Sequence, residues 1–193
     1  MAAVLSGLDV LASRLSSLLR GRTVGLLSHQ ASVTRDLTHA RQVIGAIRGV
    51  KLRRLFAPEH GLSGAAQDLV SVGAERDALT GLPVVSLYGK RLAPQPRALD
   101  GLDALVVDLQ DVGSRYYTYV WTTVLAMREA ARVRLPVIVL DRPNPLGGLT
   151  LEGNIPEPGY ASFVGLHPLP TRHGMTIAEL AAISTRRIPS AAT

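Results

Sequence analysis

Five short apolar segments that alternate with stretches of helical periodicity set the strongest constraint on the fold of this chain. The segments cover residues 23–27, 52–57, 83–87, 104–109 and 137–140. They are almost continuously apolar, which is typical of strands whose two faces are both covered by helices. Strands that alternate with helices form parallel βαβ units. The pattern therefore predicts an α/β fold, with a Rossmann-like, open, mostly parallel sheet and helices on both faces.

Helical periodicity marks three further stretches. Residues 3–20 carry leucines three and four positions apart and end at Gly21, which predicts a helix that stops there. Residues 36–48 repeat the pattern, with Leu37 on the apolar face, and residues 118–132 do the same between the last two apolar segments. We therefore expect one helix before the first strand and others between later strands.

Several ligand and site types are disfavoured by simple absences from the sequence. Gly21 and Gly25 flank the first apolar segment, where a dinucleotide-binding loop would need Gly-x-Gly-x-x-Gly. The chain has no cysteine, which excludes disulfides, thiolate metal sites and a cysteine nucleophile. We expect no cofactor and no metal.

Charge and hydropathy limit the partners. The net charge is +6, but the arginines are scattered, with adjacent pairs only at 53–54 and 186–187, so nucleic acid is not expected as a partner. No apolar run reaches the roughly 18 residues of a membrane span. Met1-Ala2-Ala3 lacks the basic start of a signal peptide, which favours a cytoplasmic location. Nothing in the sequence fixes the oligomeric state.

The amino-acid composition of the chain changes after Asp141. Residues 142–174 contain six prolines and six glycines, which predicts a long ordered loop or a linker. Thr176 and Glu179 then form the capping-box pattern that opens a helix. Because residues 184–193 are polar and unpatterned, we expect the fold to be interrupted there. The predicted organisation is a Rossmann-like domain at 1–141 and, at 142–193, a loop segment with the start of a second domain that is missing.

Polar residues follow each predicted strand, and ligands of parallel sheets bind beyond the carboxyl ends of the strands. Glu59 stands in a glycine-flanked turn and is the candidate general acid or base; alternatively it is an exposed acid at a helix start. His60 is either a site residue or a hydrogen-bonded surface histidine. The polar residues at the other strand ends are Ser28, His29, Gln30, Tyr88, Lys90, Asp108, Gln110, Asp111, Asp141, Arg142 and Asn144.

Three aspartates allow a second reading of the same edge. Asp108, Asp111 and Asp141 could ligate a divalent cation, as clustered carboxylates do, and serve a metal-dependent phosphoesterase. Alternatively, one of them caps a turn or pairs with Arg115. Nearby aromatic rings could stack on a sugar, although Trp121 is expected in the core.

Five motifs in order make the chain resemble a known family. They are Phe-Ala-Pro-Glu-His-Gly at 56–61, Ser-Leu-Tyr-Gly at 86–89, Asp-Leu-Gln-Asp-Val-Gly-Ser-Arg-Tyr-Tyr-Thr-Tyr at 108–119, Asp-Arg-Pro-Asn-Pro at 141–145 and Arg-His-Gly-Met-Thr at 172–176. With these motifs, the stretch from about Gly25 to Leu180 resembles the NamZ family of exo-β-N-acetylmuramidases.

The resemblance implies a glycoside hydrolase that releases N-acetylmuramic acid from the non-reducing end of peptidoglycan fragments. Its substrate would be a peptidoglycan-derived muropeptide or disaccharide, and its role cell-wall turnover and recycling. Members pair a Rossmann-like N-terminal domain with a C-terminal domain, and some are secreted. Because the C-terminal domain should follow Leu180, we expect low activity from this chain alone.

The resemblance also implies roles for individual residues. Glu59 matches the glutamate of the family's Pro-Glu-His-Gly motif and is the proposed catalytic residue, with His60 beside it. Its carboxylate partner is left open among Asp108, Asp111 and Glu152. Because an arginine side chain can bind a carboxylate through two hydrogen bonds, Arg115, Arg142 and Arg172 are candidates to bind the lactyl carboxylate of muramic acid. The candidate substrate contacts are Tyr88, Arg115, Tyr116, Tyr119, Asp141, Arg142, Asn144, Arg172 and His173.

Two alternatives belong to other functional classes. The chain could be a non-catalytic module that binds a muropeptide or sugar without turnover. It could also be the phosphoesterase built on Asp108, Asp111 and Asp141, in which case a chelator would abolish its activity.

Overall fold

The computed structural model describes residues 4–64, 75–89 and 91–185. Its centre is a sheet whose strands lie in the order β3-β4-β2-β1-β5-β6. All neighbours pair in parallel except β3, which pairs antiparallel with β4 at the sheet edge. The strands are β1 Thr23–Ser28, β2 Lys51–Ala57, β3 Glu75–Arg76, β4 Pro83–Ser86, β5 Ala104–Asp108 and β6 Val137–Val139. The predicted mostly parallel sheet is confirmed, and the two-residue β3 is too short for any periodic signal.

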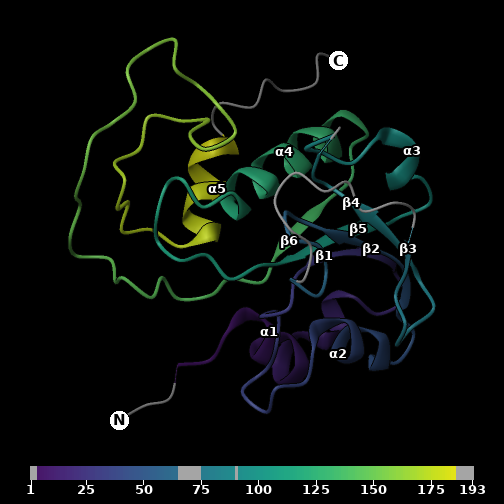
Figure 1. The fold of residues 1–193 in the computed structure, drawn as a ribbon. Coiled ribbons are helices and arrows are strands. Elements are labelled where there is room, and N and C mark those ends of the chain that lie inside the picture. The colour runs from purple at the N-terminus through teal and green to yellow at the C-terminus, as the bar shows by residue number, and fades with distance from the viewer. Residues whose placement is uncertain (1–3, 65–74, 90, 186–193) are drawn as a thin grey trace.

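Helices cover both faces of the sheet, as predicted (Figure 1). In the view of Figure 1, α3 and α4 lie above the sheet, α5 lies to the left beside α4, and α1 and α2 lie below the sheet. The helices are α1 Gly7–Val10, the π-helix η1 Leu11–Leu15, the 3₁₀-helix η2 Ser16–Leu18, α2 Ala40–Ala46, α3 Pro96–Leu99, α4 Tyr119–Arg132 and α5 Ile177–Thr185. The four-residue α3, which begins at a proline, is not predicted from the sequence.

Two hydrophobic cores lie on the two faces because successive strand residues point in opposite directions. On β2, Phe56 packs into the core under α3, α4 and α5, whereas Leu55 packs into the core over α1 and α2. Both side chains are fully buried. On β5, Val107 packs into the same core as Phe56, and Val106 packs into the same core as Leu55. This explains why the strands show continuous apolar character.

The first helix differs from its predicted range of 3–20. The α-helix begins at Gly7, because Ser6 is its N-cap and forms a capping box with Asp9. The following turns are π-helical and 3₁₀-helical and end at Leu18. Residues 1–3 of the predicted range lie outside the described residues.

The second helix is shorter than predicted. It covers Ala40–Ala46, and His39 Nδ1 accepts a hydrogen bond from the backbone N–H of Arg41 at 3.2 Å and so caps it. Leu37, which the periodicity placed on the apolar face, is 80% exposed and has a positive φ of 60°. A left-handed residue cannot continue a right-handed helix, so the apolar periodicity overestimates the helix at its start.

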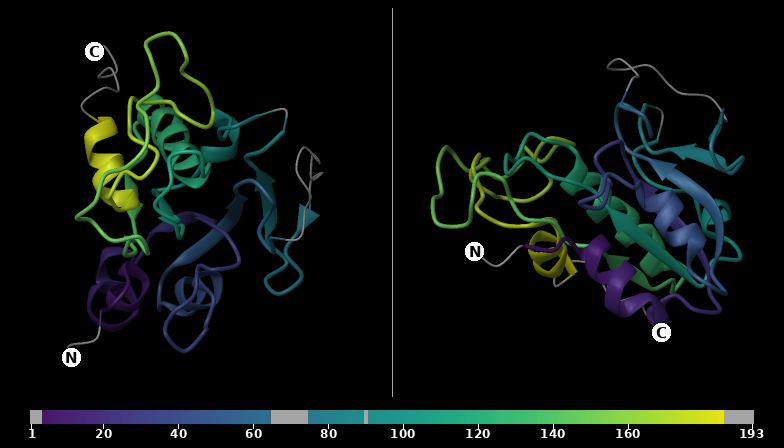
Figure 2. Two further views of the ribbon diagram at one scale, coloured as in Figure 1. Left: turned by 60° about the vertical axis from the view of Figure 1, so that its left-hand side comes forward. Right: turned by 90° about the horizontal axis from the view of Figure 1, so that it is seen from below.

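Residues 142–174 form an irregular segment that projects from the body of the molecule (Figure 2). Isolated bridges such as Glu152–Arg172 hold it together, as expected of an ordered loop. The capping box at Thr176 is confirmed, since Thr176 and Glu179 exchange backbone-to-side-chain hydrogen bonds of 2.9 and 3.3 Å.

Helix α5 extends further than the sequence pattern indicated. It runs to Thr185, and Ser184, which we assigned to an unpatterned tail, is buried. Ile177 and Leu180 belong to the same core as α4. The domain boundary after residue 141 stays a prediction, and the tail at 186–193 lies outside the described residues. Among the described residues, no helix is long and apolar enough to cross a membrane.

Candidate active site

The order of the strands reverses between β1 and β5, and in open α/β sheets this reversal point is where ligands bind. The loops that leave these two strands are tied together. His29 Nε2 accepts a hydrogen bond from the backbone N–H of Gln110 at 2.9 Å. The Ser32 hydroxyl, on the β1 side, donates to the carbonyl of Asp108 at the end of β5. The carboxyl edge of the sheet is therefore fixed by direct contacts across the reversal point.

Glu59 lies at the same edge, in the turn that follows β2. Gly61 donates to the carbonyl of Pro58 at 3.0 Å and closes the turn. Both His60 and Gly61 have positive φ, 67° and 79°. A non-glycine residue in this region costs about 1–3 kcal/mol, and such strain concentrates at functional sites. The turn thus holds the half-buried Glu59 at the carboxyl edge.

A single hydrogen bond orients the Glu59 carboxyl group. The Thr118 hydroxyl donates to Glu59 Oε2 at 2.7 Å. Thr118 occupies the N-cap of α4, yet its side chain makes no capping bond and serves Glu59 instead. Among the described residues, nothing donates to the other oxygen, Oε1. The described residues therefore hold Oε2 and supply no donor to Oε1.

Buried rings support this carboxyl group from behind. The Tyr119 ring packs edge-on against His29 at 4.7 Å and against Tyr117 at 4.9 Å between centroids. Burial raises the pKa of Tyr119, and the neighbouring Tyr117 adds to the effect. Tyr119, predicted as a sugar contact, is 2% exposed, so its ring forms part of the wall of the site.

His29 is neutral at neutral pH. Burial, with smaller contributions from the charges of Arg142 and His39, lowers its pKa from 6.5 to about 4. Because Nε2 accepts a hydrogen bond, the ring proton lies on Nδ1. Nδ1 is buried and has no hydrogen-bond partner among the described residues.

Asp108 and Arg142 are bound to each other. Arg142 Nε and Nη2 donate to the two Asp108 oxygens at 2.6 and 2.9 Å, and Nη2 also donates to the carbonyl of Val33 at 3.0 Å. The Asp108 side chain is fully buried, and burial raises its pKa more than Arg142 lowers it. This pair fastens the loops after β1, β5 and β6. The structure therefore directs the Arg142 guanidinium to Asp108 and a backbone carbonyl.

The remaining predicted residues of the inner edge also have internal partners. Asp141 accepts from the Thr176 hydroxyl at 2.8 Å and from the backbone N–H of Ala178 at 3.0 Å, so it anchors the start of α5. Asn144 donates to the carbonyl of Met175 at 3.0 Å.

Asp111 and His173 form a separate buried pair. His173 Nε2 lies 3.3 Å from Asp111 Oδ2, and both side chains are at least 95% buried. Asp111 Oδ2 also accepts from the backbone N–H of Gly113 at 2.8 Å.

These partners disfavour the metal-dependent phosphoesterase. Asp108, Asp111 and Asp141 each bind a different protein group instead of converging. The part of the chain that the structure describes contains no group of three potential metal ligands. The alternative pairing of an aspartate with Arg115 is not observed either, since Arg115 donates to the carbonyls of Asn154 and Leu169 at 2.5 and 2.6 Å.

The outer candidates lie on or beside the 142–174 segment. Arg172 pairs with Glu152 at 2.8 Å and donates to the carbonyl of Leu146 at 2.6 Å. Tyr116 is 62% exposed. Tyr88, after β4, lies with its ring centroid 6.2 Å from that of Phe163. Neither Glu152 nor the arginines Arg115 and Arg172 therefore belong to the hydrogen-bonded group around Glu59.

Sequence reasoning missed Thr118 and undervalued His29 and Gln30. In the sequence, Thr118 is distinguished only by its place at the start of a predicted helix. Its contact with Glu59 joins residues 59 positions apart, which the sequence pattern does not indicate. His29 and Gln30 follow β1, but nothing in the sequence identifies β1 as the strand at the reversal point. Gln30 lies against Gly64, where an added Cβ would come within 2.5 Å of the Gln30 amide carbon.

Comparisons with known proteins agree with this architecture. Residues 24–191 match the family model described as "Exo-beta-N-acetylmuramidase NamZ, N-terminal". A curated relative, "Peptidoglycan beta-N-acetylmuramidase NamZ" of Bacillus subtilis (strain 168), is 47% identical over 180 residues, which are 93% of this chain and 44% of the relative.

Two crystal structures of DUF1343 family proteins from Bacteroides fragilis NCTC 9343 share the fold. The first has a TM-score of 0.87 and 39% sequence identity, and the match covers 95% of this chain and 46% of that protein. The second has a TM-score of 0.80 and 30% identity, with coverages of 98% and 49%. The chain thus spans about half the length of the relatives that it matches.

Proposed function

Because the chain belongs to the NamZ family and matches its N-terminal part, we propose that it carries the acid-base edge of an exo-β-N-acetylmuramidase. The proposed reaction is hydrolysis of the glycosidic bond that links a non-reducing-end N-acetylmuramic acid to the rest of a peptidoglycan fragment. The observation that carries the proposal is the geometry of Glu59, which Thr118 holds by one oxygen at the carboxyl edge of the sheet.

The geometry of Glu59 suits a general acid. Glycosidases protonate the leaving oxygen with a carboxylic acid while the anomeric carbon gains oxocarbenium character. In this chain the proton would leave from Glu59 Oε1 as the bond between the anomeric carbon and the leaving oxygen breaks. A water molecule then adds to the anomeric carbon and loses one proton, which restores the acid form of Glu59 and completes the hydrolysis. The Thr118 hydroxyl keeps the carboxyl plane in one orientation throughout, because it holds Oε2 at 2.7 Å.

The neutral groups behind Glu59 support the same role. His29 is a weak base with its pKa lowered to about 4, so it stays uncharged at neutral pH behind the Tyr119 ring. The His29 ring packs against Tyr119 and keeps that wall rigid. Rigid positioning of an acid is what proton transfer in the transition state requires.

Substrate selectivity tests the proposal. We expect the chain to release nitrophenol from 4-nitrophenyl β-N-acetylmuramide at least tenfold faster than from the matching N-acetylglucosaminide, because only the former carries a lactyl carboxylate. The control is the same preparation with excess chelator, which should leave the rate unchanged. Equal rates on the two glycosides, or a rate lost on chelation, would contradict the proposed function.

A further inference from the structure

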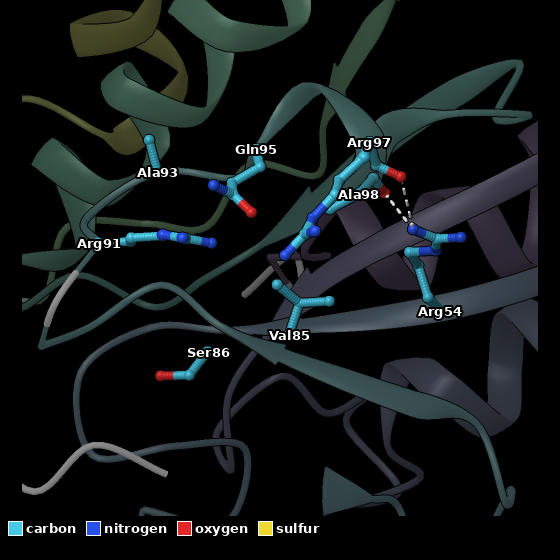
Figure 3. Close-up of a pocket in the computed structure, with 8 residues that line it drawn as sticks. All are labelled: Arg54, Val85, Ser86, Arg91, Ala93, Gln95, Arg97 and Ala98. Atoms are coloured by element: carbon cyan, nitrogen blue, oxygen red, sulfur yellow. Dashed lines mark hydrogen bonds between the residues drawn. The ribbon is translucent and has the colours of Figure 1, made fainter. Parts of the chain in front are cut away.

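A second cavity, separate from Glu59, lies on the α3 side of the sheet at strand β4. It has a volume of about 380 Å³, within the range of small-ligand sites. Its lining comes from β2, β4, α3 and the loop before α3 (Figure 3). The lining residues are Arg54, Val85, Ser86, Arg91, Ala93, Gln95, Arg97 and Ala98. None of them belongs to the group around Glu59, so the cavity needs an explanation of its own.

Three arginines line this cavity, and none of its other lining residues is acidic. Figure 3 shows the side chains of Arg91 and Arg97 directed into the same space above Val85. Some arginines of the described residues pair with acids, as Arg142 does with Asp108, whereas others, such as Arg115, donate to backbone carbonyls. Among the described residues, no carboxylate lies within ion-pair distance of the cavity arginines. Like charges that share a cavity repel each other, and a bound anion removes that repulsion.

A third arginine fixes the floor of the cavity. Arg54 Nη1 donates to the carbonyls of Arg97 and Ala98 at 3.3 and 2.7 Å, which ties α3 to β2. Its Nε is buried and has no hydrogen-bond partner among the described residues. Arg54 therefore adds positive charge and positions the helix that carries Arg97.

The loop that carries Arg91 and Gln95 is stiffened by prolines. Pro94 is buried, and Pro96 is the first residue of α3. Proline fixes φ and reduces the conformational freedom that binding would otherwise remove. The prolines therefore restrict the backbone of this loop before a ligand arrives, while Arg91 and Arg97 are exposed.

We propose that this cavity binds a monosaccharide-sized ligand that carries an oxyanion, either a carboxylate or a phosphate. Arg91 and Arg97 hold the oxyanion, since a guanidinium matches both groups bidentately. The Gln95 amide supplies hydrogen bonds for sugar hydroxyls, whereas the Ser86 hydroxyl bonds the backbone of Tyr88 at 3.3 and 3.4 Å. Val85, Ala93 and Ala98 give an apolar surface for the carbon face of the ring. The proposal does not depend on the reaction assigned to Glu59.

Calorimetric titration with three probes tests the proposal and separates the two anion types. The probes are glucose, glucuronate and glucose 6-phosphate at constant ionic strength. We expect glucuronate or glucose 6-phosphate to bind at least tenfold more tightly than glucose, and the tighter of the two identifies the anion. Equal binding of all three probes, or no binding of either anionic sugar, would overturn the proposal.

Variants show whether the cavity is responsible. The double variant Arg91→Gln and Arg97→Gln should weaken binding of the anionic sugar at least tenfold. The matched control, Arg22→Gln with Arg132→Gln, removes the same charge from two residues that do not line the cavity and should bind like the unmodified chain. Equal weakening in both double variants would show a general charge effect and overturn the proposal. Arg91→Lys keeps the charge but loses the bidentate fork, and binding between the two extremes is expected if the fold is intact.

Discussion

The buried His29 makes the stability of the fold depend on pH in a defined direction. Its pKa is about 4 in the folded chain, against 6.5 for an ordinary histidine, chiefly because burial disfavours the charged ring. Between these two values the unfolded chain binds a proton that the folded chain does not. Stability is therefore fully present above pH 6.5 and is lost as the pH falls toward 4.

The size of the effect follows from the shift. A difference of one pKa unit corresponds to 1.36 kcal/mol, so the shift from 6.5 to about 4 accounts for about 3 kcal/mol of unfolding free energy. His39, whose pKa is also lowered by burial, acts in the same direction. Asp108, whose pKa is raised, acts in the opposite direction near the acid end. Comparing the unmodified chain with a variant at position 29 separates the contribution of His29 from those of His39 and Asp108.

That comparison is urea unfolding of the chain and of His29→Gln at pH 7.5, 5.5 and 4.5. Gln can still accept the hydrogen bond from Gln110 but takes no proton. The fluorescence of Trp121, the only tryptophan and a buried one, reports unfolding. We expect the free-energy difference between the two chains to shrink by about 2–3 kcal/mol from pH 7.5 to 4.5. A difference that stays constant with pH would refute the assignment of a buried neutral His29.

Two further changes probe packing and the buried pair. Gly7→Ala should lower stability by about 1–3 kcal/mol, because a Cβ at Gly7 would lie 2.5 Å from the Asp141 nitrogen. Gly45→Ala, in the last turn of α2, should instead raise stability by up to about 0.5–1 kcal/mol, because an added Cβ meets nothing within 4 Å. Thermal melts of both variants check this, and equal shifts would contradict it. Arg142→Met should lower the free energy of unfolding by about 3–5 kcal/mol, because it leaves Asp108 buried and unpaired. Adding Asp108→Asn should restore part of that loss, which a double-mutant cycle by urea unfolding measures. Purely additive losses would argue against the pair.

The sheet could be predicted from sequence because its signals are local. Each central strand is a short apolar run, and Leu55 and Phe56 on β2 are apolar because both faces are covered. The first residues of the helices were harder to predict from the sequence. The side chains of Ser6 and His39 decide where the first two helices begin, and apolar periodicity extends past both caps.

The candidate site could be predicted only in part. Glu59 is identified by its turn and motif, and the structure places it at the carboxyl edge. The partners of Arg142 and Arg172 could not be foreseen, because ion pairs across 34 and 20 positions depend on how the loops fold over the sheet. Thr118 was hidden for the same reason, since its contact with Glu59 exists only when the start of α4 meets the turn that follows β2.

The most direct test of the central claim is the turnover of a muramic acid glycoside by the chain and by Glu59→Gln. Glutamine keeps the size of Glu59 and its hydrogen bond with Thr118 but cannot transfer a proton. We expect Glu59→Gln to reduce turnover by about 10²–10⁴-fold with an unchanged thermal melt. Glu157→Gln, a substitution at an exposed glutamate of the 142–174 segment, serves as the matched control and should keep full turnover. Unmodified turnover in Glu59→Gln, or no turnover above buffer in the unmodified chain, would contradict the account.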